Sequence, residues 1–111
     1  MSDGLRQVQR QLIIDTLATC PRVEKVVLFG SRALGNHKTG SDIDIALFGS
    51  KLDLDDLSRL SAALERLPIA QVVDLLLYHH IENRRLLEHI KREGVVWYSR
   101  SPQVPNQEKR S

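Results

Sequence analysis

The chain has 111 residues, of which 41% are hydrophobic and 27% are charged, and this length and composition predict one soluble globular domain. Its formal charge of +2 comes entirely from residues 99–111, since residues 1–98 balance, so charge gives no argument for direct nucleic-acid binding. No apolar run approaches the length of a membrane span, and the single Cys20 can form no internal disulfide, so we expect a cytoplasmic protein without a membrane segment.

The first half of the chain predicts five segments: a helix, a strand, a short helix, a turn-rich stretch and a second strand, over 5–19, 23–29, 31–34, 36–41 and 42–48. The first helix is expected to turn one apolar face inward, with Leu5, Val8, Leu12, Ile13 and Leu17. In the second strand the side chains alternate, so that Asp42 and Asp44 share one face and the large apolar residues share the other.

The second half predicts a helix, a strand, a helix and a last strand, over 54–66, 71–78, 82–92 and 95–98. Asp53 is the expected N-cap of the first of these helices, and Leu54, Leu57, Leu60, Leu64 and Leu67 are expected to point inward. The nearly continuous apolar run at 71–78 is typical of a strand that is covered on both faces. We therefore predict one domain over 1–98, followed by a disordered basic tail over 99–111.

The tetrapeptide Leu-Phe-Gly-Ser occurs twice, at 28–31 and at 47–50, and each copy ends a predicted strand. After the first copy, Gly30 lets the backbone approach a ligand closely, and the following amides and the Ser31 hydroxyl can face an anion. After the second copy, three aspartates follow within six residues, and they would repel a phosphate. The first copy is therefore the candidate phosphate-binding turn.

Three aspartates lie on strands where charge is unusual. Asp42 and Asp44 are two residues apart, so their Cα atoms lie about 6.5–7 Å apart with both carboxylates on one face. Such a pair can bind hard divalent cations, and Asp74, the one charge in an apolar strand, is the natural third ligand. The alternatives are structural: Asp42 can cap a turn, and Asp74 can pair with a core arginine or lie at a sheet edge.

Gly30-Ser31, ten intervening residues, Asp42-Ile43-Asp44 and a later strand aspartate, Asp74, together resemble the signature of the DNA polymerase β-like nucleotidyltransferase superfamily. The small size and the segment IENRRLLEHIKREGVVWY resemble the minimal nucleotidyltransferases that are encoded beside HEPN-domain proteins. The resemblance implies an α/β (α+β) fold with a small mixed sheet flanked by helices. It also implies that Gly30 and Ser31 hold the nucleotide, and that all three aspartates serve a catalytic two-metal site for Mg²⁺, with Mn²⁺ as a substitute.

Members of that family act as antitoxins of HEPN toxins, and some transfer AMP from ATP to a tyrosine of the toxin. The resemblance therefore implies a nucleotidyltransferase that forms a hetero-oligomer with a HEPN-domain partner encoded nearby. Two alternatives stay open. One is an antitoxin that neutralises its partner by covering it without catalysis. The other is a small-molecule nucleotidyltransferase of the aminoglycoside-modifying kind, although those enzymes carry an additional helical domain that 111 residues do not provide.

Two cations near the candidate turn, Arg32 and Lys38, are weaker candidates for phosphate contact, because loop cations are usually just solvated. The adjacent histidines His79 and His80, with Glu82, raise the question of a zinc site. Adjacent histidines point in different directions, however, and no further ligand completes a set, so a role at a helix boundary is favoured.

Overall fold

The computed structural model describes residues 7–35 and 42–100. Its helices and strands follow the order α1 (Gln7–Ala18), β1 (Lys25–Phe29), α2 (Ser31–Leu34), β2 (Ile43–Phe48), α3 (Leu54–Glu65), β3 (Val73–Leu77), a 3-10 turn (Tyr78–His80), α4 (Arg84–Glu93) and β4 (Val95–Ser99). The four strands form one mixed sheet, as expected, and their order in it is β3-β2-β1-β4. Strand β1 is antiparallel to β2 and to β4, whereas β2 and β3 are parallel. None of the helices in this part of the chain is both long and apolar enough to cross a membrane.

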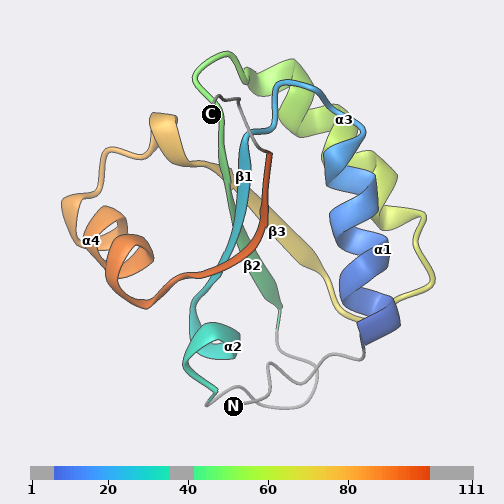
Figure 1. Ribbon diagram of the computed structural model, residues 1–111, viewed down its shortest axis with the longest axis horizontal. Helices are drawn as coiled ribbons and strands as arrows, with labels where there is room; N and C mark the ends of the chain where they lie inside the picture. Colours follow the sequence, from blue (N-terminus) through green and yellow to red (C-terminus); the bar gives the residue numbers. More distant parts are fainter. Residues whose placement is uncertain (1–6, 36–41, 101–111) are drawn as a thin grey trace, which may run out of the picture.

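Helices cover the sheet on both faces, with α1 and α3 on one side and α4 on the other (Figure 1). This arrangement follows from the alternation of the strands, whose successive side chains enter different layers. Val26, Leu28 and Ile45 belong to the core beneath α1 and α3. Val27 and Phe29, one residue along in β1, belong to a smaller cluster with Ile90 of α4. Short helix α2 lies at the end of β1, beside the beginning of β2 (Figure 1).

Two residues that were expected to face the core, Val8 and Leu54, are exposed instead. Val8 is 71% exposed, because it lies about 140° around α1 from the fully buried Ile13. Leu54 is 64% exposed because it is the first residue of α3, directly after the N-cap. Asp53 is that N-cap, as predicted, and it forms a capping box with Asp56. Leu5 lies outside the described residues.

The strand predicted at 71–78 is shorter and lies at an edge of the sheet. Strand β3 spans Val73–Leu77, and Tyr78 already belongs to the 3-10 turn. Val72, just before the strand, is 60% exposed. The apolar run arises because Leu75 and Leu77 enter the larger core while Leu76 packs in the cluster under α4.

The fold continues beyond residue 98. Strand β4 includes Ser99, and the guanidinium of Arg100 donates hydrogen bonds to the carbonyls of Ala18, Cys20 and Val23. These contacts tie the end of β4 to the end of α1, so Ser99 and Arg100 belong to the folded part and not to the tail. The rest of the predicted tail, 101–111, lies outside the described residues.

Candidate active site

The register of three neighbouring strands brings two of the predicted carboxylates together. Phe29, the last residue of β1, is paired with Asp44 of β2, and Asp44 is paired with Asp74 of β3. Asp42 lies one residue before β2 and two residues before Asp44, so the alternation of the strand puts both on the same face. That face is the one covered by α4. Asp44 is half-buried, whereas Asp42 and Asp74 are exposed.

The three carboxylates influence one another electrostatically. Partial burial raises the pKa of Asp44, and the negative charges of Asp74 and then Asp42 raise it further. Desolvation also raises the pKa of Asp74, followed by the charge of Asp42 and by a hydrogen bond with the Asp42 side chain. Burial and repulsion both make the charged carboxylates less favourable in the folded chain, and a bound cation would relieve the repulsion. Register and alternation thus place Asp42, Asp44 and Asp74 on one face of the sheet, and their joint role as a metal site stays a prediction.

Gly30 lies directly against this group. Its φ is +80°, a conformation that side-chain-bearing residues rarely adopt. A Cβ atom built on Gly30 would lie 2.5 Å from Oδ2 of Asp44, so glycine is the residue that this contact allows. Ser31 follows as the first residue of α2. The first Leu-Phe-Gly-Ser copy therefore ends beside Asp44, and its role as a phosphate-binding turn stays a prediction.

The two candidate cations differ in what the structure describes. Arg32 in α2 is only 3% exposed, and so it is not a solvated loop cation. It already takes part in an interaction within the chain. Lys38 lies outside the described residues. Phosphate contact by Arg32 or Lys38 stays a prediction.

The second Leu-Phe-Gly-Ser copy lies at the opposite end of the strands from the first copy, because β1 and β2 are antiparallel. Gly49 has a packing role there: a Cβ atom on it would lie 2.2 Å from the carbonyl oxygen of Arg22. The acidic residues that follow are also engaged, Asp53 as a helix cap and Asp56 in an ion pair with Arg22. This copy is structural.

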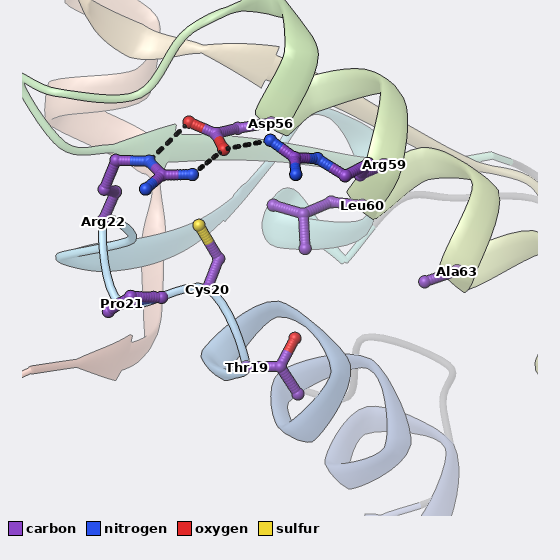
Figure 2. Close-up of a pocket in the computed structure, with 8 residues that line it drawn as sticks. All are labelled: Thr19, Cys20, Pro21, Arg22, Asp56, Arg59, Leu60 and Ala63. Carbon is purple, nitrogen blue, oxygen red and sulfur yellow. Dashed lines mark hydrogen bonds and ion pairs between the residues drawn. The ribbon is translucent and has the colours of Figure 1, made fainter.

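A pocket of about 270 Å³ opens near this end of the strands, between the end of α1 and α3. Figure 2 shows its lining residues: Thr19, Cys20, Pro21, Arg22, Asp56, Arg59, Leu60 and Ala63. The Asp56 carboxylate, 2% exposed, accepts hydrogen bonds from Arg22 and, at 3.4 Å, from Arg59. This pairing raises the pKa of Arg22 and holds the pKa of Asp56 well below its usual range. The pocket's carboxylate is committed to these two arginines, and the pocket lies away from the strand aspartates.

The donor chemistry of the site fits a hard divalent cation, because carboxylate oxygens are the preferred ligands of Mg²⁺ and Mn²⁺. Burial and then the neighbouring carboxylates raise the pKa of Asp44 and of Asp74, which agrees with a place where a cation would be favourable. Within residues 7–35 and 42–100, however, no three His, Cys, Asp or Glu side chains are gathered closely enough to hold a metal ion. The side chains of the aspartates would have to converge for binding. The same observation gives no support to a zinc site at His79 and His80.

One contact at the turn was not anticipated from the sequence. The backbone N–H of Gly30 donates a hydrogen bond to Nε2 of His89 in α4, over 3.2 Å. The His89 ring also meets the ring of Phe29 edge-on, with centroids 6.3 Å apart. The only sequence signal for this contact was the position of His89 beside Ile90, on the inward face of the predicted helix.

The family model described as "Polymerase beta, Nucleotidyltransferase" matches residues 11–103 of the chain. No curated protein sequence matches it. Among solved structures, the chain is 30% identical to one described as a minimal nucleotidyltransferase, covering 86% of this chain and 95% of that one, with a TM-score of 0.63.

Two further structures are toxin–antitoxin complexes. One, described as a toxin–antitoxin with AMP-PNP, contains a chain that is 26% identical, with 82% of this chain and 73% of that chain covered and a TM-score of 0.63. The other is the tri-AMPylated HEPN toxin of Shewanella oneidensis in complex with an MNT antitoxin; it matches at 24% identity, covering 86% and 74%, with a TM-score of 0.60. At that identity the second likeness shows the fold alone.

Proposed function

Because the chain belongs to the polymerase β nucleotidyltransferase family and is similar to its minimal members, we propose that it transfers AMP from ATP to a tyrosine hydroxyl of a partner protein. In this proposal the partner is a HEPN-domain toxin, and the chain is the antitoxin of that toxin. The observation that supports the proposal most is the close approach of Gly30 to Asp44, because the candidate phosphate-binding turn then lies against a carboxylate. A protein that uses ATP in this way would work in the cytoplasm.

We assign the nucleotide phosphates to the turn formed by Gly30 and Ser31, with Arg32 and Lys38 as secondary contacts. Asp42, Asp44 and Asp74 would hold Mg²⁺. When bound, Mg²⁺ neutralises phosphate charge and stabilises the attacking and leaving oxygens of an in-line displacement. The support for this assignment is the chemistry of the donor set and the register that pairs Asp44 with Asp74 on neighbouring strands.

In the proposed reaction, the acceptor hydroxyl oxygen forms a bond to the α-phosphorus of ATP while the bond from that phosphorus to the bridging oxygen breaks. Pyrophosphate leaves, and the hydroxyl proton passes to a carboxylate. Asp74 is the candidate acceptor of that proton, because it is exposed and lies on the strand next to Asp44. The other contribution of the chain is to position the two reactants.

The partner is proposed from the related complexes. The chain that is 26% identical belongs to a toxin–antitoxin complex that contains AMP-PNP, an ATP analogue. The AMPylated toxin of the Shewanella oneidensis complex motivates the acceptor class. We therefore propose a hetero-oligomer in which a HEPN-domain protein supplies the acceptor hydroxyl.

Intact-mass spectrometry tests the transfer. The protein, in substoichiometric amount, is mixed with its HEPN-domain partner, ATP and Mg²⁺, and the partner is expected to gain mass in increments of one AMP. Asp44→Asn should abolish the gain, and Ser50→Ala, at the structural copy of the motif, should leave it intact. If neutralisation instead needs a stoichiometric amount, leaves the partner's mass unchanged and survives Asp44→Asn, the chain acts by covering its partner.

Calorimetry tests the nucleotide site without the partner. ATP binding should require Mg²⁺ or Mn²⁺ and should be lost in the double variant Asp42→Asn/Asp44→Asn, because carboxamides are poor ligands for hard cations. Binding that the double substitution leaves unchanged would place the nucleotide elsewhere on the chain.

A further inference from the structure

His89 and the candidate turn are joined by a direct hydrogen bond between segments far apart in the sequence. The N–H of Gly30 donates to Nε2 of His89 over 3.2 Å, across 59 positions of the chain. In α4, His89 precedes Ile90, which is 2% exposed and packs with Val27 and Phe29 of β1. The helix is thus anchored on the strand that leads into the turn, and the His89 ring is held at a defined place.

The hydrogen bond acts on Gly30, the residue of the turn that lies against Asp44. Gly30 approaches Asp44 so closely that a Cβ atom would lie 2.5 Å from Oδ2. A shift of the Gly30 peptide therefore changes the room available to the Asp44 carboxylate. It also moves the next residue, Ser31, which begins α2. A hydrogen bond that holds the Gly30 peptide therefore also holds Ser31 and the space around the Asp44 carboxylate.

The arrangement also determines what Gly30 can offer a ligand. A ring nitrogen that accepts a hydrogen bond carries no proton of its own, and in this contact Nε2 of His89 is the acceptor. The Gly30 N–H is then already occupied. Its contribution to the site is orientation, and contact with phosphate passes to the groups that follow it in the turn.

From these contacts we infer that His89 is a positioning residue of the nucleotide site: it holds the Gly30 peptide so that the turn and Asp44 face the ATP phosphates together. The inference rests on the proposed nucleotidyl transfer. It assigns His89 no contact with substrate or metal. Its role is carried by one accepted hydrogen bond, which can be separated from the packing of the ring.

Two substitutions separate the hydrogen bond from the packing. His89→Phe keeps an aromatic ring against Phe29 but has no acceptor, whereas His89→Gln lacks the ring but can place a side-chain oxygen near the position of Nε2. We expect His89→Phe to lower kcat/KM for ATP about tenfold, mostly through a higher KM, because one positioning hydrogen bond is lost. His89→Gln should recover most of that loss. His80→Leu, which removes an exposed histidine from the 3-10 turn, is the matched control and should behave as wild type.

The readouts are ATP binding by calorimetry, AMP transfer to the partner, and the NMR shift of the Gly30 amide proton, which should move in His89→Phe and return toward its wild-type value in His89→Gln. If His89→Phe does not fold, His89→Leu takes its place as the variant without an acceptor. An active wild type in which His89→Phe equals or exceeds His89→Gln would overturn this inference alone. A wild type that neither binds ATP nor transfers AMP would overturn the proposed function, and the inference with it.

Discussion

Replacing Gly30 with alanine tests the contact between the turn and the carboxylates. The added Cβ would lie 2.5 Å from Oδ2 of Asp44, and ordinary contact begins at 3.4 Å, so one of the two groups must move by about 1 Å. Rotating the Asp44 side chain away from its preferred rotamer costs about 0.5–1.5 kcal/mol. The left-handed backbone at φ +80° costs a residue with a Cβ about 1–2 kcal/mol more. We expect the free energy of unfolding to fall by about 1.5–3.5 kcal/mol.

The effect on catalysis should be larger than the effect on stability. A displacement of a catalytic group by about 1 Å typically lowers the rate about a hundredfold. We therefore expect Gly30→Ala to remain folded at 25 °C while its rate of AMP transfer falls about a hundredfold or more. Urea unfolding gives the stability, and intact-mass spectrometry of the partner over time gives the rate.

Gly35 supplies the matched control, since its φ of +79° imposes the same backbone cost on alanine. Gly35→Ala should lose about 1–2 kcal/mol of stability and keep most of its transfer rate. The reasoning is refuted if Gly30→Ala loses no more activity than Gly35→Ala, because the contact with Asp44 would then have no catalytic consequence.

Ser31→Ala should weaken ATP binding by about 1–2 kcal/mol in calorimetry, whereas Ser50→Ala should leave it unchanged; equal effects would contradict the choice between the two copies. Desolvation and the neighbouring carboxylates raise the pKa of Asp74, so the folded protein holds extra protons just above pH 3.8 and its stability falls as the pH rises from there. Asp74→Asn should remove the part of this fall in stability that Asp74 causes. At pH 7 the metal-free variant should be as stable as wild type or, after solvent screening, up to about 1 kcal/mol more stable. A large loss of stability in urea unfolding would instead make Asp74 a structural residue. Arg22 lowers the pKa of Asp56, so that pair stabilises the fold at neutral pH and loses its effect on strong acidification. Asp56→Asn should therefore lower the thermal midpoint clearly at pH 7 while Asp55→Asn, on the exposed side of α3, should not.

The local part of the site followed from the sequence because it depends on short-range rules. Alternation within one strand is enough to put Asp42 and Asp44 on the same face, and a glycine after a strand is enough to mark a turn. Asp53 was identified as a helix cap for the same reason, since a cap depends on residues within one turn. Features of this kind are determined by neighbours a few positions away.

Features that depend on distant segments were missed. The hydrogen bond from Gly30 to His89 spans 59 positions, and the contact of Arg100 with Ala18 spans 82. No periodicity encodes such pairs, because they arise only when α4 and β4 are laid against β1 and α1. The edge position of β3 also depends on distant segments, and the sequence left it open as one alternative.

The most direct test of the account is a crystal structure of the protein with AMP-PNP and Mn²⁺, measured at a wavelength where manganese scatters anomalously. The account predicts an anomalous peak within bonding distance of the Asp42 and Asp44 carboxylates, with the phosphates of the analogue against the turn at Gly30. An anomalous peak or a nucleotide at the opposite end of the strands, in the pocket beside Arg22 and Asp56, would contradict the account.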